Sequence, residues 1–135
     1  MKLFSTLASV FVLSVLFLSC NSEPVTLSDH DWKVTDLAGS SATSDKLETL
    51  TLIFEEDQEI GGFAGCNDFR GAATFNQEQI KFSTLYSDNA SCDDINMEKR
   101  YLSNLESSTS YTYSAGTLVL YDEGGNIVVE MEKDE

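Results

Sequence analysis

The stretch that decides the fold reads GCNDFRG, residues 65–71. Its outer glycines, Gly65 and Gly71, permit a sharp bend, because glycine adopts backbone conformations that other residues avoid. Asn67 has a short side chain that can bond to the local backbone, and Phe69 can turn into a core. A bend of this composition needs no ligand, so the stretch predicts a structural element rather than a binding site.

A second glycine pair lies just before the bend, in Gly61-Gly62-x-x-Gly65. Nucleotide-binding loops of this kind connect a strand to a helix in a βαβ unit, and no such unit surrounds this segment. The glycines therefore predict a bent strand or a β-bulge that leads into the bend.

Short runs of alternating apolar residues flank the bend on both sides, as expected of half-buried strands. They lie at 32–37, 50–54, from 59 into the glycines, 72–75, 79–86, 111–113, 117–121 and 127–131. One helix follows Cys92, since Asp93 or Asp94 can cap its start and four apolar residues share one face: Met97, Tyr101, Leu102 and Leu105. The pattern predicts an α+β fold, a mainly antiparallel barrel-like sheet of about eight strands with one packed helix.

The N-terminus has the features of an export signal. Lys2 precedes an almost uncharged stretch at 3–19, which ends on a small residue directly before Cys20. A cysteine in this place is typical of the bacterial lipobox, in which it is lipidated and becomes the new N-terminus. We therefore expect a lipoprotein signal peptide at 1–19, a lipidated polar tether at 20–30 and one folded domain at 31–135. An ordinary signal peptide and a short transmembrane helix remain alternatives.

Lipidation of Cys20 places the protein in the bacterial cell envelope, attached to a membrane through this anchor. Asn21 follows the cysteine where an aspartate would favour retention at the inner membrane, so we expect an outer-membrane lipoprotein, periplasmic or surface-facing.

Three cysteines are an odd number, which needs an explanation in an exported protein. Acylation of Cys20 leaves Cys66 and Cys92 as one pair in an oxidising compartment. A disulfide between them would stabilise the fold by roughly 3 kcal/mol on the chain-entropy model. Two free buried thiols are the alternative.

The formal net charge of −15 disfavours nucleic acid and anionic headgroups as partners, because like charges repel. The single histidine, His30, falls in the expected tether, where no nucleophile or base is held rigidly enough for catalysis. Cys66 and Cys92 lack two further ligands for a zinc site. The acidic turn at 122–126 lacks the spacing of a calcium loop. We expect no catalytic residue, no metal and no cofactor.

The stretch at 65–71 resembles the G-C-N-x-F-x-G signature of the META-domain family of HslJ-like bacterial lipoproteins. Its structural motif residues would be Gly65, Cys66, Asn67, Phe69 and Gly71. Other features follow in the family's order: a strand with Trp32, a second cysteine after a strand, a helix at 98–105 and a final hairpin with two glycines. The resemblance covers residues 31–131. It implies a META-like fold and a link to stress response, antibiotic tolerance or secretion, without a transferable molecular activity.

Three functions are compatible with these observations. The first is a non-enzymatic envelope lipoprotein with a stress-response or adaptor role, acting through contacts with an unknown envelope protein. The alternatives are a carrier of a small apolar ligand in the barrel interior and an unrecognised hydrolase. Six aromatic residues are enough to fill a small barrel and favour the first: Trp32, Phe54, Phe63, Phe69, Phe75 and Phe82.

Overall fold

The computed structural model describes residues 26–88 and 90–134. The expected signal peptide at 1–19, the expected lipidation site at Cys20 and the first part of the tether lie outside the described residues. Within the described ranges, no helix is both long and apolar enough to cross a membrane.

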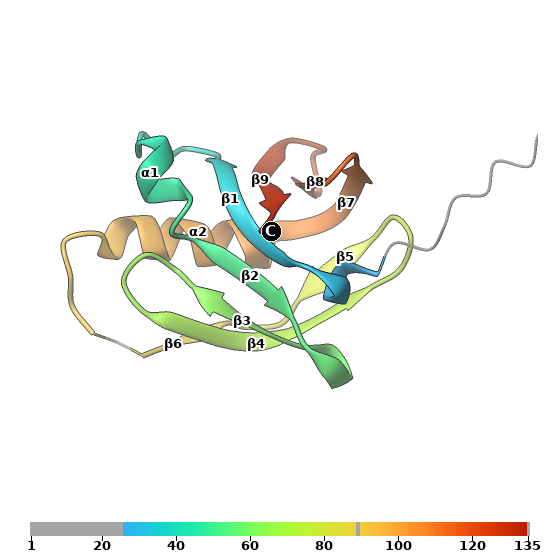
Figure 1. Cartoon of the computed structure of the whole chain (residues 1–135), viewed down its shortest axis with the longest axis horizontal. Coiled ribbons are helices and arrows are strands. Elements are labelled where there is room, and N and C mark those ends of the chain that lie inside the picture. Colours follow the sequence, from blue (N-terminus) through green and yellow to red (C-terminus); the bar gives the residue numbers. More distant parts are fainter. Residues whose placement is uncertain (1–25, 89, 135) are drawn as a thin grey trace, which may run out of the picture.

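Nine strands form one antiparallel sheet in the described part of the chain (Figure 1). They are β1 (Asp31–Leu37), β2 (Thr51–Phe54), β3 (Glu59–Phe63), β4 (Asp68–Phe75), β5 (Ile80–Phe82), β6 (Tyr86–Ser87), β7 (Ser108–Ser114), β8 (Thr117–Asp122) and β9 (Ile127–Lys133). The helices are α1 (Ser44–Leu47) and α2 (Ile95–Ser107), with 3-10 turns η1 (Leu27–Asp29) and η2 (Glu56–Gln58).

The strand order is β5-β4-β3-β2-β1-β9-β8-β7, with β6 paired to β4 beside β5. A single bridge between Gln79 and Ser110 brings the β5 end of this order to β7, so the sheet forms a nearly closed barrel. This confirms the expected barrel-like α+β fold. The strand expected at 79–86 is two strands, because the backbone N–H of Leu85 leaves the ladder and donates to the Glu106 carboxylate of α2 at 2.7 Å.

Apolar side chains fill the barrel interior. The largest fully buried ones include Trp32, Tyr101, Met131, Leu118 and Leu120. Four of the six aromatic residues expected inside are buried, whereas Phe75 is 39% exposed and Phe63 is half-buried. The aromatic rings therefore close the core as predicted, except for these two.

Helix α2 packs against β5, β8 and β9 and covers one end of the barrel. Its amphipathic face buries Tyr101 and Leu105, and the Tyr101 hydroxyl donates to Thr51 O at 3.0 Å. Asn104 Nδ2 donates to Ala38 O at 3.1 Å, just past the end of β1. The helix is thereby fixed to the beginning of β2 and to the end of β1.

The folded domain begins before Asp31, so the tether expected at 20–30 is too long at its C-terminal end. Leu27 is fully buried, and Trp32 Nε1 donates to Leu27 O at 3.0 Å. His30 lies edge-on to Trp32, with ring centroids 6.0 Å apart. Burial of one leucine and one indole hydrogen bond hold η1 on the barrel, and His30 belongs to the edge of the domain rather than to a linker.

Candidate functional site

The turn at residues 64–67 connects β3 to β4 and contains the beginning of the GCNDFRG stretch. Ala64 N donates to Asn67 O at 2.9 Å and closes the turn. Gly65 has a φ of +95°, and a Cβ built there would lie 2.6 Å from Met97 Cε on α2. The backbone conformation disfavours a side chain at this position, and the ends of the Met97 and Leu50 side chains would have to shift to make room for one.

Cys66 and Cys92 form a disulfide, with their Cα atoms 6.0 Å apart. This separation lies in the range that a disulfide bridges without backbone movement. The pairing confirms the expectation from the cysteine count over two free thiols. The bond joins the turn at 64–67 to the segment that enters α2.

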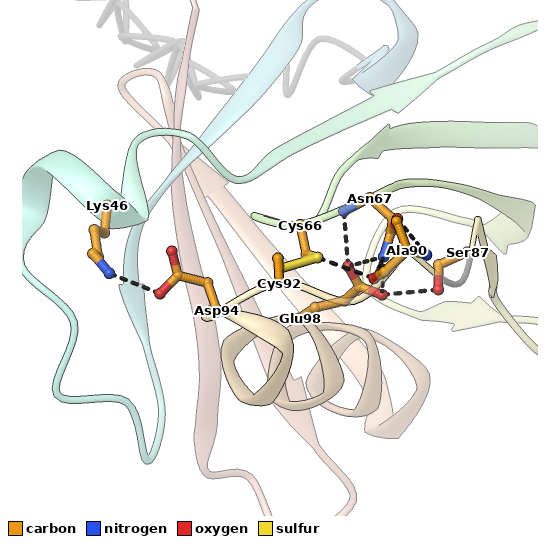
Figure 2. Close-up of a disulfide and its surroundings, with 8 residues drawn as sticks. All are labelled: Lys46, Cys66, Asn67, Ser87, Ala90, Cys92, Asp94 and Glu98. Atoms are coloured by element: carbon orange, nitrogen blue, oxygen red, sulfur yellow. Dashed lines mark hydrogen bonds and ion pairs between the residues drawn. A yellow bond between two sulfur atoms is a disulfide. The ribbon is translucent and has the colours of Figure 1, made fainter.

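A buried glutamate lies next to this disulfide (Figure 2). Glu98, on α2, is 3% exposed, and its carboxylate accepts hydrogen bonds from Asn67 N at 2.8 Å and Asn67 Nδ2 at 3.0 Å. Ser87 Oγ, on β6, donates to the same carboxylate at 2.8 Å. Bonds to a charged acceptor are stronger than neutral ones, so these donors offset much of the cost of burying the carboxylate.

Asn67 also holds the segment that precedes α2. Its Oδ1 accepts from Ala90 N at 3.0 Å and its Nδ2 donates to Ala90 O at 3.0 Å. Asn67 is 4% exposed, so both ends of its amide are used inside the protein. One asparagine therefore connects the turn, the helix and the segment before the helix, and we call Asn67, Glu98, Ser87 and Ala90 the Asn67 network.

The Asn67 network is complete in its hydrogen bonding. In residues 26–88 and 90–134, no buried side-chain nitrogen or oxygen lacks a partner. The carboxylate of Glu98 is surrounded by donors, and the amide of Asn67 is bonded to the protein at both ends. Such an arrangement can fasten three segments together, whereas a general acid or base must face a substrate.

The sequence predicted the motif residues but not Glu98. Glu98 lies within the apolar face of α2, between Met97 and Tyr101, and a charged residue inside such a face was the signal that could have identified it. The structure brings Glu98 together with Cys66 and Asn67, places Phe69 edge-on to Tyr101 at 5.8 Å, and leaves Gly71 on β4 away from the network.

The cap expected from Asp93 or Asp94 takes a different form. Asp94 is the N-cap residue of α2, but its side chain makes no capping bond. Its carboxylate instead pairs with Lys46 Nζ of α1 at 2.7 Å. The aspartate therefore joins two helices in place of closing the first turn of one.

The acidic segment at 122–126 is a hairpin turn between β8 and β9, as its Gly- and Asn-containing sequence predicts. Asp122 Oδ1 accepts from Asn126 N at 2.8 Å, and Asn126 Nδ2 donates to the same carboxylate at 3.1 Å. These bonds to Asn126 lower the pKa of Asp122 below its ordinary value. In the part of the chain that the structure describes, no group of three or more His, Cys, Asp or Glu residues is placed to hold a metal ion.

Comparisons with known proteins agree with this fold. A family model described as META domain matches residues 25–135. None of the curated proteins compared with the sequence matches it. Among solved structures, a DUF4847 family protein from Bacteroides vulgatus is similar, with a TM-score of 0.62 and 11% identity over 81% of this chain and 96% of that one.

Two further structures are similar in fold. A protein from Burkholderia xenovorans, solved by NMR, has a TM-score of 0.61 and 21% identity over 80% of this chain and 83% of its own. Another NMR structure has a TM-score of 0.60 and 19% identity over 78% of this chain and 90% of its own. At these identities the likeness shows the fold alone.

Proposed function

The chain belongs to the META-domain family, and from this premise we propose that it is a membrane-anchored, non-enzymatic lipoprotein of the bacterial cell envelope. Its role would be that of an adaptor, with a stress-response function, exerted through contacts with another envelope protein. The expected anchor is a lipid on Cys20, in the outer membrane, after removal of a signal peptide at 1–19.

The non-enzymatic part of the proposal rests on one observation: the polar side chains of the motif bond to other residues of the protein. Cys66 bonds to Cys92, and Asn67 bonds to Glu98 and Ala90. The polar groups of the family motif are therefore used within the protein. This supports a motif that shapes the domain, with recognition performed elsewhere on its surface.

The filled barrel argues against a carrier of apolar ligands. A ligand pocket in a small barrel needs interior space of a few hundred Å³. Here Trp32, Tyr101 and Met131 are among the fully buried side chains of the core. No specific observation favours the carrier or the hydrolase, and neither is proposed.

The start of the domain is compatible with a short connection to a membrane. Thr26 is the first described residue and leads directly into η1. Five residues, 21–25, lie between it and Cys20. The six Cα-to-Cα steps of an extended chain over this length span at most about 20 Å. A domain held on such a tether would stay near the bilayer while its side faces remained accessible.

The experiment compares two variants in the organism that carries the protein. Cys20→Ala should release the protein from the membrane fraction and abolish its cellular role. His30→Ala is the matched control, because it removes the single imidazole and should leave both the fractionation and the role intact. Thermal unfolding of the purified His30→Ala protein checks that the loss of its contact with Trp32 does not unfold the domain.

Two outcomes would contradict the proposal. If the Cys20→Ala protein stays in the membrane fraction and keeps its role, Cys20 does not carry the membrane anchor. Turnover of a substrate by the purified protein, stopped by replacement of a pair of carboxylates, would show an enzyme.

A further inference from the structure

A row of four residues crosses the outer face of β2, β3, β4 and β6. Ile53 lies opposite Gly61, Gly61 opposite Arg70, and Arg70 opposite Tyr86. Residues directly opposite each other in an antiparallel pair project from the same face of the sheet. Arg70 and Tyr86 are exposed whereas Phe69, the neighbour of Arg70 in the strand, is buried, so the row faces outward.

Gly61 makes a notch in this row because it has no side chain. The notch lies in a groove of about 620 Å³ that is lined by Ile53, Gly61 and Arg70, among others. A Cβ built on Gly61 would lie 3.3 Å from Phe69 O of the neighbouring strand and 3.7 Å from Glu55 Oε1, so a backbone oxygen and a carboxylate oxygen border the notch. The groove therefore combines a position without a side chain with a negative rim.

Three carboxylates line the groove: Glu55, Glu59 and Asp68. All three are exposed, and the salt bridges found among the described residues join other pairs, Lys33–Asp134 and Lys46–Asp94. Arg70 is the single cationic residue of the lining. Three carboxylates against one guanidinium leave the rim with a net negative charge, and none of the three forms a salt bridge among the described residues.

Tyr86 extends the groove on the β6 side. It is 68% exposed, the largest exposed fraction among the large hydrophobic side chains of the described residues. Tyrosine and arginine are the residue types that most often carry binding energy at protein interfaces. An exposed tyrosine in register with an arginine, beside an empty notch, is the composition expected of a contact surface.

We propose that this groove, lined by Gly61, Ile53, Arg70 and the three carboxylates and flanked by Tyr86, binds a basic segment of the partner protein. An aliphatic side chain of the partner fills the notch at Gly61, and flanking Lys or Arg side chains pair with Glu55, Glu59 and Asp68. The overall charge of −15 attracts a basic partner over long range and disfavours a second copy of this chain. This inference rests on the proposed adaptor function and names its surface and the chemistry of its partner.

The test uses the mature, full-length protein in detergent and a fluorescent peptide of alternating Lys and Leu with blocked ends. Binding is measured by fluorescence anisotropy at physiological salt, where weak long-range attraction is screened. Replacing the three carboxylates together, as Glu55→Gln, Glu59→Gln and Asp68→Asn, should weaken binding about tenfold or more. A control protein with Asp45→Asn, Glu48→Gln and Asp93→Asn has the same net charge, and its affinity should change by no more than about twofold.

Two single variants test the apolar part of the groove. Tyr86→Ala and Gly61→Val, which fills the notch, should each weaken binding about fivefold or more. Ile127→Ala is the matched control, because Ile127 is also an exposed apolar residue, 43% exposed, on the distant strand β9. Unchanged thermal unfolding of both variants shows that their effects come from the surface and not from the fold. Gly61→Val needs this check because its Cβ would lie 3.3 Å from Phe69 O.

Several outcomes would overturn the inference. Absence of binding at millimolar peptide excludes a basic-segment groove. Equal losses in both triple variants mean that overall charge alone attracts the peptide. Self-association of the protein that Tyr86→Ala abolishes would make a second copy the occupant. Each of these leaves the adaptor proposal standing if Cys20→Ala still abolishes the cellular role, so the two failures are distinguishable.

Discussion

Replacing Glu98 by Leu tests the structural role of the Asn67 network most sharply. The substitution keeps an apolar helix face and removes the acceptor of Asn67 N, Asn67 Nδ2 and Ser87 Oγ. Ser87 is half-buried and can turn to water, whereas the backbone N–H of Asn67 and one of its two Nδ2 hydrogens lose their acceptor. The other Nδ2 hydrogen keeps its bond to Ala90 O. At about 1–3 kcal/mol for each unsatisfied N–H group, the free energy of unfolding should fall by roughly 2–6 kcal/mol.

Urea unfolding of the disulfide-bonded protein measures this loss, with the slope m checking that the transition stays two-state. Glu106→Gln is the matched control: the residue is a glutamate of the same helix that accepts from Leu85 N at 2.7 Å, but it is exposed. Its replacement should cost about 1 kcal/mol or less. If Glu98→Leu costs no more than Glu106→Gln, the network does not fasten the motif and the reasoning is wrong.

Four further predictions concern stability. Replacing Cys66 or Cys92 by Ser should cost about 2–5 kcal/mol in urea unfolding, and a variant as stable as the wild type would show that the disulfide does not secure the turn. Leu27→Ala should lower the free energy of unfolding by about 2–5 kcal/mol, since Leu27 is fully buried. A change near zero would mean that η1 is not part of the folded domain. Gly62→Ala should destabilise strongly, because the added Cβ would overlap the backbone oxygen of Thr51 at a φ of +157°; normal thermal unfolding would contradict this. Burial raises the pKa of Tyr101 above its ordinary value of 10.0, so the stability that its neutral form contributes is complete below about pH 10 and is lost above it. Tyr101→Phe should therefore reduce the fall of the unfolding free energy above pH 10 by up to about 1.4 kcal/mol per pH unit. An unchanged slope in chemical unfolding would refute the assignment.

Much of the fold was predictable because local patterns and tertiary packing agree. Alternation in residues such as Trp32, Val34, Leu118 and Leu120 marks strands that are buried on one face, and the structure buries all four. Gly65 predicted a bend, and its φ of +95° requires one. At these positions, the side chain that suits the local backbone also suits the core.

Other features were not predictable because they depend on contacts between distant segments. Leu27 lies in a polar segment without periodicity, and its burial follows from its contact with Trp32. Phe75 continues the inward pattern of β4 but is 39% exposed at the end of its strand. The alternation of apolar residues along a strand does not by itself show where the barrel interior ends.

The candidate site shows the same division. The pairing of Cys66 with Cys92 could be predicted from the number of cysteines. Asn67 could be identified as a structural residue from its place in the motif. Glu98 is 31 residues away from Asn67 in the sequence, and its role appears when α2 is laid against the turn at 64–67. The notch at Gly61 depends likewise on strand register, since it exists because Ile53 and Arg70 are its neighbours across two strand pairs.

The central claim, that this META-domain protein works at a membrane as a tethered module, is tested most directly by the mass of its mature N-terminus. Intact mass spectrometry of protein purified from the cell envelope should show a chain that begins at Cys20, with its mass increased by a diacylglyceryl group and, where the organism adds it, an N-acyl chain. A chain that still begins with Met1, or one that begins at Cys20 without lipid, would contradict the account.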